Sequence, residues 1–254
     1  MDRALFKLHR RTEDTHWWFC ARREIIFSFL SGILPPDSQT LVIEAGCCTG
    51  GNLRYFGKFY DTAGFDSDPE AVELASRGTS HDRVFLSDNP RDLHEYASRA
   101  HAFLLLDILE HIEDDSAFFS SLVDEMREGS YCIITVPANM EIWSRHDVTY
   151  GHKRRYDVAG LRRLWAGMPV KCEYISHFNS RLYALIWLTR VMNKLTNSAS
   201  GEAGTDLSVP SGPVNSILHK IFAGESRKLL ERFRKRGGEA YKSGASLIAV
   251  LKKI

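Results

Sequence analysis

Short apolar runs alternate along most of the chain with longer segments whose apolar residues recur every three or four positions. The short runs predict strands over residues 41–44, 62–66, 83–86, 102–107 and 131–136. The segments between them predict helices over residues 50–58, 69–77, 91–99 and 115–126. Strands that alternate with helices in this way form a parallel sheet covered on both faces. The pattern therefore predicts a doubly wound α/β fold.

The segments on either side of this alternation have different patterns. Residues 1–39 predict a helical cap, which ends at the helix-breaking pair Pro35-Pro36. Beyond the fifth strand the pattern predicts a further helix over 157–165 and a strand over 171–176. The alternation of strands and helices stops after that strand.

Residues 177–245 predict a helical insertion with two helices, near 182–188 and over 214–236, joined by a loose linker over 198–212. The first helix is apolar and the second ends in a basic run. Three interpretations of the segment 180–236 remain open: a lid over an amphipathic acceptor, a face that contacts an anionic membrane surface, or a helical hairpin packed on the sheet or on the second subunit of a homodimer.

Composition restricts the classes of function. The chain has 254 residues and a net charge of +1, and its apolar content of 44% and charged content of 26% are typical of a soluble globular protein. So balanced a charge predicts no binding to nucleic acid. The N-terminus lacks the pattern of a secretion signal, and no apolar run approaches the roughly 20 residues that span a bilayer. We therefore expect a cytoplasmic protein.

The first predicted strand leads into a Gly-rich turn, and this turn carries the strongest chemical signal. Glu44 ends the apolar run, Gly46 and Gly51 follow, and Asp66 ends the second strand 22 residues after Glu44. An acidic residue at this distance reaches an adenosine ribose. Cys48 occupies the place where a dinucleotide site has its second glycine, and Glu44 would repel a pyrophosphate. The turn therefore favours a cationic adenosine ligand over NAD.

These residues resemble the class I S-adenosylmethionine-dependent methyltransferases. The first motif of that family, an acidic residue followed by Gly-x-Gly-x-Gly, is similar to Glu44, Gly46 and Gly50, with Cys48 in place of the middle glycine. The resemblance covers residues 17–156 and continues at Asp66, at Leu86-Ser87-Asp88 and at Asp107-Ile108-Leu109-Glu110-His111-Ile112.

The resemblance implies a Rossmann-like, seven-stranded, mostly parallel sheet whose last strand, over 246–251, is antiparallel. It divides the chain into a cap (1–39), a cofactor-binding core (40–176), the helical insertion (177–245) and the last strand (246–254). It also implies that S-adenosylmethionine is the cofactor. The residues expected to bind it are Arg22, Glu44, Gly46, Cys47, Gly50, Asp66, Ser67, Asp88 and Asp107.

The segment 136–156, which follows the fifth strand, is unusually rich in His, Asp and Arg. His146 or His152 would deprotonate an acceptor hydroxyl, and His111, after the fourth strand, is a third candidate. The expected substrate-binding residues are Trp143, Asp147, Arg154, Arg155 and Tyr156. A loop held by salt bridges remains an alternative interpretation. A metal site formed by His146, Asp147 and His152 would lack a helical His pair, so we expect no metal.

Together these features predict an S-adenosylmethionine-dependent methyltransferase acting on a small-molecule acceptor. Its target would be a hydroxyl of a glycan precursor, of a lipid-linked compound or of a secondary metabolite. Two alternatives remain open: a catalytically silent cofactor-binding or regulatory subunit, and a nicotinamide-dependent oxidoreductase.

Overall fold

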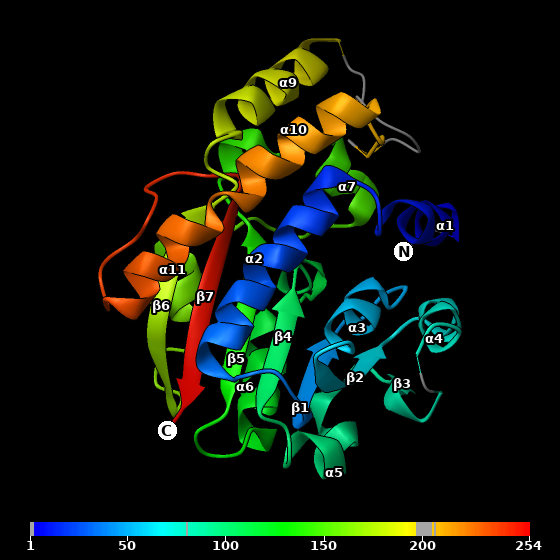
Figure 1. Ribbon diagram of the computed structural model, residues 1–254, viewed down its shortest axis with the longest axis vertical. Coiled ribbons are helices and arrows are strands. Elements are labelled where there is room, and N and C mark those ends of the chain that lie inside the picture. Colours follow the sequence, from blue (N-terminus) through cyan, green and yellow to red (C-terminus); the bar gives the residue numbers. More distant parts are fainter. Residues whose placement is uncertain (1–2, 80, 197–204, 206) are drawn as a thin grey trace.

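The computed structural model describes residues 3–79, 81–196, 205 and 207–254, and its centre is one seven-stranded sheet (Figure 1). Most of the linker expected over 198–212 lies outside the described residues. The strands run in the order β3-β2-β1-β4-β5-β7-β6, and β7 is antiparallel to both of its neighbours whereas the other pairs are parallel. The predicted fold is confirmed. The strands are β1 (Asp37–Ala45), β2 (Tyr60–Asp66), β3 (Val84–Leu86), β4 (Ala102–Leu106), β5 (Tyr131–Pro137), β6 (Val170–Phe178) and β7 (Ser246–Lys253).

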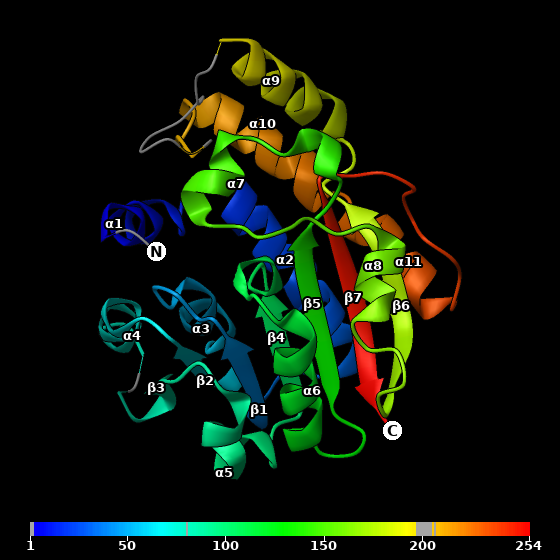
Figure 2. The same cartoon turned by 180° about the vertical axis from the view of Figure 1, so that it is seen from behind.

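Helices cover both faces of this sheet (Figures 1 and 2). Alternation along β4 separates the two cores: Phe103 and Leu105 face one layer, while Leu104 and Leu106 face the other. The first layer contains α5 (His94–Ala97), α6 (Asp115–Glu125) and α8 (Val158–Arg163), and the second contains α2 (Trp17–Ile33), α10 (Gly212–Ala223) and α11 (Ser226–Arg234). All five residues of β4 are buried, which is typical of a central parallel strand.

The turn after β1 is fixed by backbone bonds and by glycine. The amides of Gly46 and Cys47 both donate to the carbonyl of Phe65, at 2.8 and 3.0 Å, which ties the turn to β2. Gly46 has φ +69°, and a Cβ there would lie 2.0 Å from the side chain of Ile108. Glycine is therefore required sterically at the start of the turn. Gly50 then leads into α3 (Gly51–Phe56).

Three expected helices differ from the prediction. The first helix ends at Phe56 rather than at residue 58, and the segment 91–99 forms a 3₁₀ turn (Pro90–Leu93) followed by the short α5. The helix expected over 214–236 is two helices, α10 and α11. Between them the buried Glu225 accepts hydrogen bonds from the amides of Ser180 and Arg181, at 2.8 and 2.7 Å. The break therefore combines a local signal, Gly224 as the C-cap of α10, with this tertiary contact. In contrast, α4 (Pro69–Ser76) begins as expected, with Asp68 as its N-cap.

Several elements lie beyond the carboxyl end of the sheet (Figure 1). They are α1 (Arg3–Thr12), α7 (Arg145–Tyr150), α9 (Tyr183–Thr196), the upper part of α10 and two 3₁₀ turns (Leu109–His111 and Met140–Ile142). The segment 136–156, which the sequence predicted to be a loop, contains α7. Within the described parts of the chain, no helix combines the length and apolarity needed to cross a bilayer.

Candidate active site

A cavity of about 370 Å³ opens at the carboxyl ends of β1, β4 and β5, a volume typical of small-molecule sites. Its walls come from the turn after β1, from α1, α2 and α7, and from α9 and α10 of the insertion. The predicted site residues that line it are Arg22, Cys47, Asp107, His111, His146, His152 and Arg155. The other predicted residues lie around it or behind its walls.

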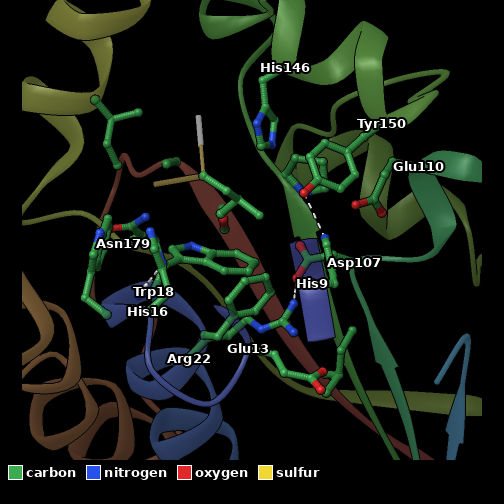
Figure 3. Close-up of a pocket in the computed structure, with 18 of the residues that line it drawn as sticks. His9, Glu13, His16, Trp18, Arg22, Asp107, Glu110, His146, Tyr150 and Asn179 are labelled. Carbon is green, nitrogen blue, oxygen red and sulfur yellow. Dashed lines mark hydrogen bonds and ion pairs between the residues drawn. The ribbon is translucent and has the colours of Figure 1, made fainter. Parts of the chain in front are cut away.

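Arg22 and Asp107 form an ion pair in the wall of the cavity (Figure 3). Asp107 directly follows β4, has φ +57°, and also accepts a hydrogen bond from Thr135 Oγ1 at 3.0 Å. The guanidinium carbon of Arg22 lies 4.5 Å from the centre of the Trp18 ring, a cation–π distance. Arg22 Nε is buried and has no partner among the described residues. Arg22 therefore retains one donor for an anionic ligand group.

Glu44 lies behind the cavity wall, with 2% of its surface exposed. Asn52 Nδ2 donates to Glu44 Oε1 at 2.6 Å, and Oε2 has no partner among the described residues. Burial raises the pKa of Glu44 to about 8. Asn52 itself lines the cavity, so a cationic ligand group would meet Asn52 first and sense Glu44 through it.

The acidic residues after β2 and β3 lie at the outer rim of the same sheet edge. Asp66 accepts from the Cys48 amide at 2.9 Å and from the Asp68 amide at 3.0 Å, which fixes its carboxylate next to the Gly-rich turn. Burial raises its pKa. Ser67 and Asp88 are exposed. These three residues would reach a ligand that extends from the cavity across the ends of β1, β2 and β3.

The N-terminal helix α1 is joined to both sides of the cavity, which the sequence analysis did not predict. His9 Nε2 lies 2.8 Å from Tyr150 Oη of α7, and burial lowers the pKa of His9 to about 4, with a smaller effect of Arg22. Glu13 accepts a hydrogen bond from Thr49 Oγ1 at 2.7 Å and pairs with Arg54. No local signal marks His9 or Glu13, because their partners are distant in the sequence.

Asp147 organises the segment after β5. Its buried carboxylate accepts from His152 Nδ1 at 2.9 Å, from Arg155 Nε at 2.8 Å, from the Ser144 amide at 2.8 Å and from Arg190 Nη1 at 3.2 Å. Burial by itself would raise the pKa of Asp147, but the His152 hydrogen bond and the two guanidinium groups outweigh it and hold the pKa well below its usual range. Asp147 thus positions its neighbours rather than facing the cavity.

Three histidines and a glutamate gather at the top of β4 and α7. The rings of His111 and His152 are 4.8 Å apart at 86°, and His146 lies 4.6 Å from the Tyr150 ring, measured between centroids. Burial lowers the pKa of His111 to about 3, helped by His152, and burial together with Arg190 lowers that of His146. Figure 3 shows Glu110, Tyr150 and His146 on one side of the cavity, across from Trp18.

Glu110 is the residue of this group that the sequence analysis did not select. It lines the cavity, is 1% exposed, and neither carboxylate oxygen has a partner among the described residues. Burial and the nearby Asp107 raise the pKa of its carboxyl group well above the usual range. The sequence feature that could have marked Glu110 as a site residue is its position directly before His111.

The remaining predicted substrate residues lie elsewhere. Arg154 Nη1 contacts Asp115 at 2.9 Å, and Tyr156 Oη donates to Asp115 at 2.5 Å. Arg154 and Tyr156 line a second hollow, which Arg155 also lines. Trp143 is half-buried and does not line the main cavity. The structure therefore separates Arg154, Tyr156 and Trp143 from the histidine group.

Comparison with known proteins identifies the fold and the family. The model of a methyltransferase domain matches residues 18–189, which is more than half of the chain. The chain belongs to the methyltransferase-domain family. It is a class I S-adenosylmethionine-dependent methyltransferase, as the turn after β1 predicted. No curated protein sequence matches the chain.

Solved structures of other methyltransferases share its fold at low identity. An S-adenosylmethionine-dependent methyltransferase from Archaeoglobus fulgidus is 17% identical, with a TM-score of 0.51 over 91% of this chain and 94% of the other. The plantazolicin methyltransferase BamL, solved with a triazolic desmethylPZN analogue and SAH, is 14% identical, with a TM-score of 0.57 over 98% and 88%. A Haloferax volcanii methyltransferase solved with the Trm112 activator is 16% identical, with a TM-score of 0.59 over 98% and 94%.

Proposed function

We propose that this methyltransferase methylates a hydroxyl group of a small, largely apolar acceptor. The observation that carries the proposal is the composition of one cavity. Arg22, Asn52 and the turn after β1 line the same cavity as the histidines and several apolar side chains of the insertion. Cofactor and acceptor would therefore meet in one cavity.

The cofactor would bind across the carboxyl ends of β1, β2 and β4. Asp66 would accept hydrogen bonds from the ribose, and Asp88, with Ser67, would lie near the adenine. The free Nε of Arg22 would hold the methionine carboxylate, and Asn52, supported by Glu44, would lie near the ammonium group. Gly46, Cys47, Gly50 and Asp107 would line the path between these groups. S-adenosylmethionine supplies an electrophilic methyl group on its sulfonium sulfur.

His146 is the proposed proton acceptor for the acceptor hydroxyl. It lines the cavity, and its imidazole is neutral at pH 7, the form in which a histidine accepts a proton. Burial and Arg190 lower its pKa, so the imidazolium formed in the reaction would release the proton again readily. Its environment is set by the Asp147 group, in which Arg155 and Arg190 are held. Asp147 would therefore act as a positioning residue, and Arg155, which also donates to the Ala138 carbonyl at 2.9 Å, would line the acceptor side of the cavity.

The insertion indicates the character of the acceptor. Leu185, Ile186 and Leu218 line the outer part of the cavity, so an apolar body would be favoured next to the hydroxyl. Plantazolicin methyltransferases, which share the fold, were solved with triazolic and pentazolic desmethylPZN analogues, and this supports a small-molecule acceptor. The net charge of +1 supports the expectation that nucleic acid is not the acceptor.

The outer surface of the insertion would contact a membrane surface. Large apolar side chains on α9 and α10 are 43–57% exposed, and Leu185 among them also lines the cavity. An apolar acceptor could then enter from the lipid phase. A homodimer formed through the same surface is the alternative, and analytical ultracentrifugation would detect it. The exposed apolar side chains of this surface are Leu185, Trp187, Leu188, Met192, Val214 and Ile217.

The cofactor proposal is tested by calorimetric titration with S-adenosylmethionine, S-adenosylhomocysteine and NAD. We expect binding of the first two, weakened about 100-fold or more by Asp66→Ala, because two hydrogen bonds to a charged group are worth about 3 kcal/mol or more. The matched control is Asp61→Ala, at the other end of β2, whose carboxylate pairs with Arg83 at 3.2 Å. Preference for NAD, or equal binding by both variants, would contradict the proposal.

The acceptor proposal is tested by S-adenosylhomocysteine release in the presence of hydroxylated apolar compounds. With an active compound, His146→Gln should lower kcat by about 100-fold to 10,000-fold and leave cofactor affinity unchanged. If the protein binds cofactor but no hydroxylated acceptor is turned over, the catalytically silent regulatory subunit becomes the better account. The methyltransferase solved with an activator partner is a precedent for assembly of such a fold with a second protein.

A further inference from the structure

Three potential metal ligands converge in the cavity from two separate segments. Glu110 and His111 lie in the 3₁₀ turn after β4, and His152 follows α7. One ligand atom from each, a carboxylate oxygen and two imidazole nitrogens, lies within 4.8 Å of the others. Ligand atoms on a four-coordinate ion with bonds of about 2.0–2.2 Å are roughly 3.3 Å apart. Small side-chain rotations would therefore close the set around one ion.

Glu110 is the least satisfied group in this set. Its side chain is almost fully buried, and neither oxygen accepts a hydrogen bond from any described residue. A buried carboxylate without partners is costly, and proteins normally supply such a group with donors or a cation. The guanidinium group of Arg22, which could act as such a cation, is already paired with Asp107. Glu110 thus presents two free oxygen atoms to the cavity.

Both histidines are held by a hydrogen bond to a neighbouring group. His152 Nδ1 donates to the buried Asp147 at 2.9 Å, which leaves Nε2 for a ligand. His111 forms a hydrogen bond with the backbone of Tyr150. A carboxylate or a backbone carbonyl behind an imidazole is the usual support of a metal-bound histidine. The arrangement therefore resembles a ligand set together with its outer support.

We propose that Glu110, His111 and His152 bind one divalent transition-metal ion in the cavity. Two nitrogens and one oxygen favour ions of the zinc, cobalt, manganese and iron class over magnesium or calcium, which take oxygen ligands. Three protein ligands leave at least one coordination position open toward the cavity. This role rests on the proposed function: the acceptor oxygen would occupy the open position, and the ion would lower the pKa of the acceptor hydroxyl and orient it. The released proton would pass to His146, the proton acceptor proposed above, whose ring centroid lies 6.2 Å from that of His152.

The sequence suggested a different set, His146, Asp147 and His152, and predicted no metal. Asp147 contributes no ligand in the new set, because His152, Arg155, Arg190 and Ser144 occupy its oxygens. Glu110 replaces it from a segment that lies more than 30 residues away in the sequence. Asp147 is a positioning residue for His152.

The test is metal binding by the tag-free, chelator-treated full-length protein. Calorimetric titration with Zn²⁺, Co²⁺, Mn²⁺ and Mg²⁺ should show one equivalent of a transition-metal ion bound more tightly than Mg²⁺. Glu110→Gln and His152→Gln should weaken binding at least 10-fold, and Asp147→Asn should weaken it 10-fold to 100-fold by releasing His152. His94→Gln is the matched control, because His94 also contacts a carboxylate, Glu125 at 2.5 Å, but lies on the surface.

Thermal unfolding provides a second measurement that does not depend on variant affinity. The ion should raise the Tm of the wild-type protein and leave that of Glu110→Gln unchanged. In the metal-free state Glu110→Gln should be at least as stable as wild type, since it removes an unpaired buried carboxylate.

Two outcomes would overturn the inference: no stoichiometric binding of any transition-metal ion, or binding that Glu110→Gln and His94→Gln retain equally. Metal binding without binding of S-adenosylhomocysteine would support the inference and contradict the proposed function. Cofactor binding and methyl transfer by the chelator-treated protein, with no effect of added ion, would support the proposed function. The same result would contradict the role given to the ion.

Discussion

The replacement of Asp147 by Asn should be among the most destabilising conservative substitutions in this protein. The carboxylate is completely buried, and it compensates two guanidinium groups that are themselves nearly buried, Arg155 with 4% of its side chain exposed and Arg190 with 10%. Asn keeps one acceptor oxygen, but it removes the charge and turns an amide group toward the cations. Breaking a buried ion pair by removing one partner costs about 3–5 kcal/mol. This is a large part of the total stability of a typical domain, about 5–15 kcal/mol.

The assay is equilibrium unfolding in urea, followed by far-ultraviolet circular dichroism and by tryptophan fluorescence. With an m-value of about 3 kcal/mol/M, the midpoint should fall by about 1 M or more at constant m. The control is Asp124→Asn on the surface of α6, where Asp124 is 55% exposed and pairs with Arg91 at 3.2 Å. An exposed pair contributes about 0–1 kcal/mol, so the control should stay close to wild type. Equal midpoints for the two variants would refute the argument that Asp147 holds the segment 144–155 together.

Three further predictions concern separate parts of the molecule. Burial raises the pKa of Glu44 from 4.5 to about 8, so between these pH values the folded protein keeps a proton that the unfolded chain releases. The contribution of Glu44 to the free energy of unfolding therefore falls as the pH rises from 4.5 to 8. Glu44→Gln should remove up to about 1.4 kcal/mol of this loss per pH unit, and identical pH slopes of urea unfolding would contradict it. Gly46→Ala should lower the stability by about 2–3 kcal/mol and weaken cofactor binding, because the new Cβ would lie 2.0 Å from the side chain of Ile108. The control, Gly32→Ala, should not destabilise the protein, because the space around Gly32 is open. The double substitution Trp187→Ser with Leu188→Ser should reduce sedimentation with anionic phospholipid vesicles, and Leu86→Ser, equally exposed on β3, should leave it unchanged.

Local sequence signals were sufficient for the parallel strands of the sheet, whereas the antiparallel last strand was implied by the family resemblance. Each strand is an apolar run next to a helical pattern, and the fold requires only that such runs be buried on both faces. The strands over 41–44, 102–107 and 131–136 were predicted within a few residues for this reason. The Gly-rich turn was equally readable, because a positive φ at Gly46 and Gly50 is a local backbone requirement. Family membership then agreed with what these short segments indicated.

Helix ends were less predictable where a tertiary contact decided them. The pattern over 214–236 is helical apart from Gly224, where α10 ends, and the next residue, Glu225, turns inward to accept two amides that precede α9. No property of the sequence 220–230 reveals those amides. The segment 91–99 is shortened for a different reason, because a local cap, Asn89, begins a 3₁₀ turn at Pro90 before the short α5.

The sequence by itself determined the fold, the turn after β1 and the residue types of the site, since all of these depend on spacing and backbone geometry within short segments. Only the tertiary structure decided which residues meet. It turned Asp147 away from the cavity and into contact with two arginines, paired Arg22 with Asp107, and brought Glu110 beside His152. The physical reason is that such contacts join atoms from distant segments, and the free energy that selects them depends on burial and on every neighbouring charge. Neither quantity is written in any single stretch of the chain.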